Sequence, residues 1–66
     1  MMKYKVISEM SDKVVAFTTS HLINAQAYLW YMIDGKEAYI ADKLEVNMLY
    51  RGSLDNETVY ITEGEE

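Results

Sequence analysis

Polar and apolar residues alternate in the first part of the chain. From Lys3 to Glu9, successive side chains fall on opposite sides of an extended backbone, which is the period of a β-strand. Residues 10–13 are turn-forming, and the β-branched and aromatic residues of Val14–Thr18 are typical of a second strand. The pattern therefore predicts a β-hairpin with Tyr4 and Phe17 facing inward.

A helical pattern follows the hairpin. Apolar residues recur at helical spacing along one stripe, which consists of Leu22, Ala25, Leu29, Met32 and Ile33. We expect the hydroxyl group of Thr19 or Ser20 to cap the first turn. We expect the helix to end near Asp34 and Gly35, because glycine adopts the left-handed conformation at helix ends.

The segment from Lys36 to Arg51 allows two interpretations. Asp34 and Glu37 have the spacing of a helix capping box, which would begin a second helix. Its inward residues would be Ala38, Ala41, Leu44 and Met48. Every second residue from Leu44 to Tyr50 is apolar, however, which is the period of a half-buried strand. We prefer a strand from about Leu44, and a short edge strand over Ala38–Ala41 stays open.

The last part of the chain predicts a loop and a strand. Residues 52–56 are rich in turn-forming types, and Thr58–Thr62 alternate, with the odd-numbered residues turned inward. Residues 63–66 are expected to form a solvated acidic tail. Together the elements predict one α+β domain over residues 1–66. A small antiparallel sheet in ββαββ order would be covered on one face by a single helix.

Composition narrows the ways in which so short a chain can be stabilised. The 66 residues include no cysteine and one histidine, which excludes disulfides, thiolate metal sites and the usual zinc sites. A core of this size is marginal on its own. Oligomerisation is the stabilising route that the composition leaves open, and we expect a homo-oligomer.

Charge and hydropathy exclude two classes of partner. Eleven acidic residues against six scattered basic ones give a net charge of −5, whereas nucleic-acid binding needs clustered Lys and Arg. The chain has no formal charge from Val14 to Ile33 with His21 neutral, but only residues 22–33 are mostly apolar. This is shorter than the ~20 residues that cross a bilayer. We expect a cytoplasmic protein that binds neither nucleic acid nor membranes.

The candidates for catalysis and metal binding are few. His21 is the one histidine and so the one candidate of the residue type most often used as a general base, but sequence neighbours such as Ser20 and Thr19 rarely have the geometry of a catalytic triad with it. Residues 55–57 form the densest carboxylate group, but they lack the ligand spacing of a calcium loop and are expected to form a turn. The three glycines are isolated, so no phosphate-binding loop is present. We expect no enzyme, no cofactor and no metal.

The second side of the helix is the strongest functional signal. It carries aromatic and neutral side chains where a solvated helix would show Lys and Glu. Tyr and Trp commonly anchor protein interfaces because they combine a large area with a polar group. We expect an interface formed by His21, Asn24, Ala27, Tyr28, Trp30 and Tyr31.

Two functional hypotheses result. The preferred one is a non-catalytic protein-binding module, homo-oligomeric through its helix. Chain size, acidity and element order are common among phage and mobile-element proteins, which makes an inhibitor of a host or defence protein one form of this hypothesis. The alternative is a small-ligand protein with an aromatic pocket at an oligomer interface. A nucleotide-like ligand would then need positive charge from Lys36, Lys43 or Arg51.

Overall fold

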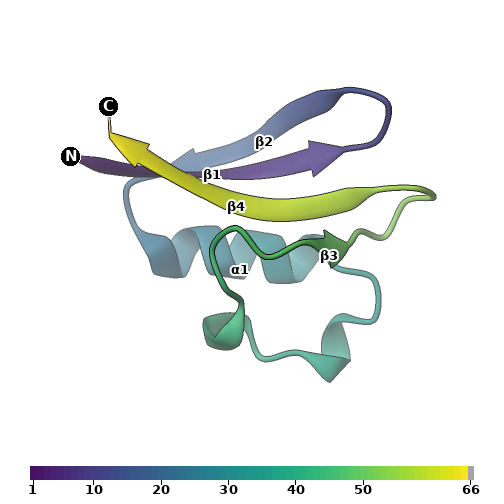
Figure 1. The fold of residues 1–66 in the computed structure, drawn as a ribbon. Helices are drawn as coiled ribbons and strands as arrows, with labels where there is room; N and C mark the ends of the chain where they lie inside the picture. Colours follow the sequence, from purple (N-terminus) through teal and green to yellow (C-terminus); the bar gives the residue numbers. More distant parts are fainter. Residues whose placement is uncertain (66) are drawn as a thin grey trace.

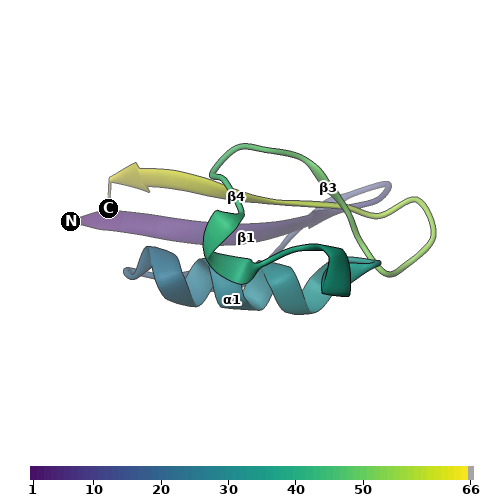
Figure 2. The same ribbon diagram turned by 90° about the horizontal axis from the view of Figure 1, so that it is seen from below.

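The computed structural model describes residues 1–65, and of Glu37 it describes the backbone alone. The elements in chain order are β1 (Met2–Glu9), β2 (Lys13–Thr19), α1 (Leu22–Met32), the short 3-10 helices η1 (Lys36–Ala38) and η2 (Ala41–Lys43), β3 (Tyr50–Arg51) and β4 (Thr58–Glu65). Within these residues the strands form an antiparallel sheet in the order β2-β1-β4-β3, and α1 packs on one face of it (Figures 1 and 2). The predicted α+β fold with a helix on one face of the sheet is confirmed.

The core lies between the sheet and α1. Its buried residues come from both central strands, from the helix and from the segment that follows it: Val6, Val59, Ile61, Ala25, Leu29, Ile33 and Leu44. The helical stripe predicted from spacing is thus turned toward the sheet. Tyr4 and Phe17 are half-buried and pack against this cluster, as predicted. Fully burying each large apolar side chain contributes about 1.5–3 kcal/mol to folding.

The helix begins one residue later than a Ser20 cap, and two residues later than a Thr19 cap, would place it. β2 continues through Thr19, so Thr19 stays in the sheet and His21 becomes the N-cap, without a side-chain capping bond. The Thr19 hydroxyl instead accepts a hydrogen bond from the His21 backbone N–H at 3.2 Å. The prediction of Thr19 or Ser20 as N-cap was therefore wrong. At the other end, Gly35 is left-handed with φ of 73°, as predicted, two residues beyond the C-cap Ile33.

The strand preferred within residues 44–51 is present only as its last two residues, and the second helix is not formed. Instead of a second helix or a long strand, the chain forms η1, η2 and a loop, and β3 contains only Tyr50–Arg51. Asn47 is left-handed with φ of 67°, which interrupts any extended run from Leu44. Ala38–Ala41 form no edge strand, and the Glu37 side chain of the expected capping box lies outside the described residues.

β4 is longer than the sequence pattern predicts. It pairs with β1 along its whole length, from Glu9 opposite Thr58 to Met2 opposite Glu65. Residues 63–65 are exposed, as a solvated tail would be, but their backbone belongs to the sheet. The strand continues there because residues 2–4 of β1 offer it an adjacent backbone to pair with. Glu66 lies outside the described residues.

Candidate interaction surface

The side of α1 turned away from the sheet exposes an uncharged stripe. Ile23, Ala27 and Tyr31 follow one another at intervals of four residues, so they lie in line along the helix. Asn24 lies beside them, and all four side chains are exposed, Ile23 and Tyr31 each to 69%. We call these four residues the outer helix face. The whole helix, from Leu22 to Met32, contains no charged residue.

The six predicted interface residues divide into two groups. His21, Asn24, Ala27 and Tyr31 are exposed, whereas Tyr28 and Trp30 are half-buried. The Tyr28 ring stacks on the Phe17 ring of β2, with 4.6 Å between the centroids and 1° between the planes. Stacked aromatic pairs of this kind contribute about 0.5–1.5 kcal/mol beyond the area they bury. Tyr28 thus has a packing role on the β2 flank of the helix.

Trp30 lies on the opposite flank, where a second segment runs beside the helix. We call residues 36–48 the turn segment. In Figure 1 its two short helices, η1 and η2, lie below β3 and next to α1. The Trp30 Nε1–H donates a hydrogen bond to the Tyr39 carbonyl oxygen at 2.9 Å. The Lys36 ammonium lies 5.8 Å from the Trp30 ring centroid and 5.0 Å from that of Tyr31. A positive charge therefore flanks one end of the outer helix face.

The turn segment also adds apolar surface next to this face. Gln26 donates hydrogen bonds from its Nε2 to the carbonyl oxygens of Leu44, at 2.9 Å, and Asp42, at 3.4 Å. Together with the Trp30–Tyr39 bond, these contacts hold residues 39–44 against the helix. Ile40 lies between the two anchoring points and is 67% exposed. The turn segment thus adds the exposed apolar side chain of Ile40 beside α1, together with the exposed charges of Asp42 and Lys43.

Residues 55–57 lie in a turn, as expected, because the Glu57 backbone N–H donates to the Leu54 carbonyl oxygen at 3.1 Å and Asn56 is left-handed with φ of 61°. The burial of the Glu57 side chain was not predicted, and the neighbouring Asp55 is exposed. The Ser8 hydroxyl donates to Glu57 Oε2 at 2.5 Å, and the Leu54 backbone N–H donates to Oε1 at 3.1 Å. A serine at an inward position of β1 was the sequence signal of a buried polar partner. The carboxylate therefore braces the loop between β3 and β4.

Among the described residues, few groups that could bind a metal ion or a nucleotide lie close together. Among the side chains that the structure describes, no three of His, Cys, Asp and Glu lie close enough together to hold a metal ion. Lys36 and Arg51 line two separate hollows, and Lys43 lines neither of them. Arg51 is instead 3.7 Å from the Asp34 carboxylate, at an exposed position. The three cations considered for a nucleotide are thus dispersed.

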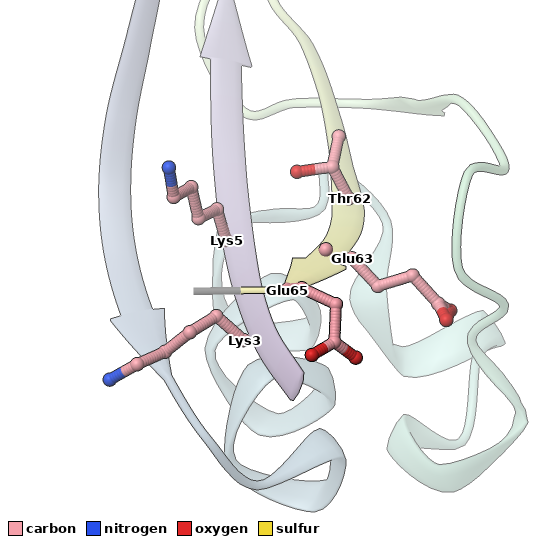
Figure 3. Close-up of a pocket in the computed structure, with 6 residues that line it drawn as sticks. Lys3, Lys5, Thr62, Glu63 and Glu65 are labelled. Carbon is pink, nitrogen blue, oxygen red and sulfur yellow. The ribbon is translucent and has the colours of Figure 1, made fainter. Parts of the chain in front are cut away.

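A shallow hollow lies on the face of the sheet opposite α1. Its polar side chains do not point toward a common centre. It lies where Gly64, which has no side chain, pairs with Lys3 of β1, and its other lining residues are Lys5, Thr62, Glu63 and Glu65. Figure 3 shows the two lysine side chains diverging from each other and both glutamates turned away from them. The hollow is a consequence of the missing side chain.

Comparisons with protein-family models, with curated proteins and with solved structures found no match to this chain. Within residues 1–65, no helix has the length and apolar character that crossing a membrane requires.

Proposed function

We propose that this protein is a non-catalytic protein-binding module and that the outer helix face is its contact surface. The observation that carries the proposal is an uncharged helix, eleven residues long, that leaves Ile23 and Tyr31 exposed in a protein of net charge −5. A helix whose second side met only water would normally carry Lys and Glu there. A partner that covers this side removes apolar surface from water, and it desolvates no charge of the helix.

Two details support a protein as the partner. Tyr31 is a large exposed ring beside the Lys36 ammonium, and aromatic side chains of this kind commonly dominate binding energy at protein interfaces. Ile40 of the turn segment widens the surface beyond the helix. The small-ligand alternative receives less support, because the cations that it needs line different hollows.

Affinity purification from the native host, with matched surface variants as bait, tests this proposal. Tyr31→Lys adds a charge to the outer helix face, and Thr18→Lys adds the same charge to an exposed position of β2. We expect proteins that the wild type and Thr18→Lys retain to be lost with Tyr31→Lys. Circular dichroism should show that both variants keep the native fold.

The same protein set on all three baits would contradict the proposal, since the outer helix face would then contribute nothing to binding. The hypothesis that the partner is a host or defence protein rests on chain size, acidity and element order. The identity of the retained proteins tests that hypothesis directly.

A further inference from the structure

We infer that the outer helix face binds the same face of a second copy of this chain, with the two α1 helices antiparallel and crossing at Ala27. The inference rests on the proposed function, because it names the occupant of that surface. A symmetric dimer of this kind uses one patch twice, so the patch must be complementary to itself.

The spacing of the exposed residues meets this requirement. Ala27 stands midway between Ile23 and Tyr31, four residues from each. A two-fold axis through Ala27, perpendicular to the helix, brings Ile23 of one copy next to Tyr31 of the other and each Ala27 next to its equivalent. Both large side chains then meet a large apolar partner, and the small residue lies at the crossing point.

The small side chain matters because helices pack closely. Packed helix axes are about 8–10 Å apart, and Cα atoms lie about 2.3 Å from each axis. Two equivalent Cα atoms that face each other at the crossing are therefore separated by about 3.4–5.4 Å. Alanine is compatible with such an approach, and Ile23 and Tyr31 pack on either side of it.

Charge favours this surface over the rest of the molecule for self-association. Each copy carries a net charge of −5, so the repulsion between two copies is smallest where they meet through residues without acidic side chains. α1 contains none, and the Lys36 ammonium lies 5.0 Å from the centroid of the Tyr31 ring. In Figure 2 the turn segment, with η1 and η2, lies in front of and beside part of α1, and it leaves Ile23, Ala27 and Tyr31 exposed.

The size of the surface sets the expected strength. An eleven-residue helix is about 16 Å long at 1.5 Å per residue. A contact limited to it and to the adjoining turn segment falls below the roughly 800 Å² per partner of a standard interface. We therefore expect a dimer in rapid exchange, with half-association at micromolar to high micromolar concentration.

The edge of β2 is the rival contact. Val14 and Val15 are exposed there, to 57% and 51%, and β2 is the first strand of the sheet. However, the pairing of β1 and β2 jumps from Phe17 to Val15, so Ala16 is an extra residue in β2. Such a bulge twists an edge strand and interrupts its pairing with another chain. The helix is the better surface, and the edge is one outcome of the test.

Disulfide trapping tests the inference, because the chain contains no native cysteine. Under mild oxidation, Ala27→Cys should form a covalent dimer within minutes, since the expected Cα separation overlaps the roughly 4.4–6.8 Å of disulfides. Thr18→Cys and Val15→Cys, both in β2, should stay monomeric under the same conditions. Circular dichroism should confirm that every variant is folded.

A second trapping experiment measures orientation. Ile23→Cys and Tyr31→Cys should each stay largely monomeric alone, but a mixture of the two should yield the mixed disulfide. Self-crosslinking of Ile23→Cys alone would indicate parallel helices and would overturn the antiparallel arrangement.

The outcomes separate this inference from the proposed function. If Ala27→Cys does not crosslink and sedimentation shows a monomer at high micromolar concentration, the second copy is not the occupant. The purification with Tyr31→Lys can still support binding of another protein in that case. If Val15→Cys crosslinks instead, copies meet at the β2 edge and the inference is wrong.

Discussion

The burial of the Glu57 carboxylate is a feature of a single residue that the sequence pattern did not predict. The position next to Asp55 and Asn56 indicated a turn, which is confirmed, but carboxylates are rarely fully buried. The side chain is instead only 6% exposed, because both of its oxygen atoms receive hydrogen bonds. Gly52 packs directly against it, and a Cβ at that position would collide with the Glu57 side chain. The Ser8 contact joins residues 49 positions apart, so the loop sequence alone does not reveal this arrangement.

Gly52→Ala should therefore destabilise the protein, whereas Gly64→Ala should not. The new methyl group at position 52 displaces a carboxylate that is anchored at both oxygens, and overpacking of this kind costs about 1–3 kcal/mol. At Gly64, by contrast, nothing lies within 4 Å of the added Cβ. Urea unfolding followed by circular dichroism measures both midpoints. Equal midpoints for the two variants would mean that the carboxylate moves aside without loss.

α1 shows which elements can be predicted and which cannot. Its buried stripe follows from periodicity alone, because Ala25, Leu29 and Ile33 repeat at helical spacing. The turn segment has no comparable signal. Its position depends on side-chain donors of the helix, Gln26 and Trp30, that bind its carbonyl groups. Alternation from Leu44 to Tyr50 favoured a strand because the order of polar and apolar residues carries no sign of these hydrogen bonds.

Gln26→Ala should loosen the turn segment and leave the sheet intact. The variant removes the hydrogen bonds to the Leu44 and Asp42 carbonyl groups, each worth about 0.5–1.5 kcal/mol. Hydrogen exchange should accelerate at the amides of Lys43 and Leu44, which close η2. The amides of β1 should keep their wild-type rates. Asn24→Ala, on the outer helix face, is the control and should alter neither region.

At the scale of the whole molecule, the sequence predicted the arrangement of sheet and helix better than it predicted which helix residues are exposed. Alternating strands around one amphipathic helix in a chain of 66 residues leave few α+β arrangements, and the sheet with α1 on one face is among them. The interface prediction was made from the helix alone. Position on the wheel could not show that Tyr28 stacks on Phe17, because that contact depends on the place of β2.

The melting temperature should rise with protein concentration. Association stabilises the folded state in proportion to the logarithm of free partner over the dissociation constant. From ten micromolar to one millimolar, the wild type should therefore gain several degrees in a domain of this size. Tyr31→Lys should melt at a temperature independent of concentration, close to that of the dilute wild type. A wild type with the same midpoint at every concentration would contradict the proposed dimer.

The pairing of β1 with β4 has a consequence for the order in which the protein folds during synthesis. The hairpin of β1 and β2 and the helix α1 involve neighbouring residues and can form early, but Val59 and Ile61 complete the core from β4. Contacts between such distant parts of a chain close slowly, because a long loop must be ordered first. On the ribosome, β1 and β2 can therefore cover only part of the apolar stripe of α1 until residues 58–65 have left the exit tunnel, and the remainder is available to chaperones during that interval.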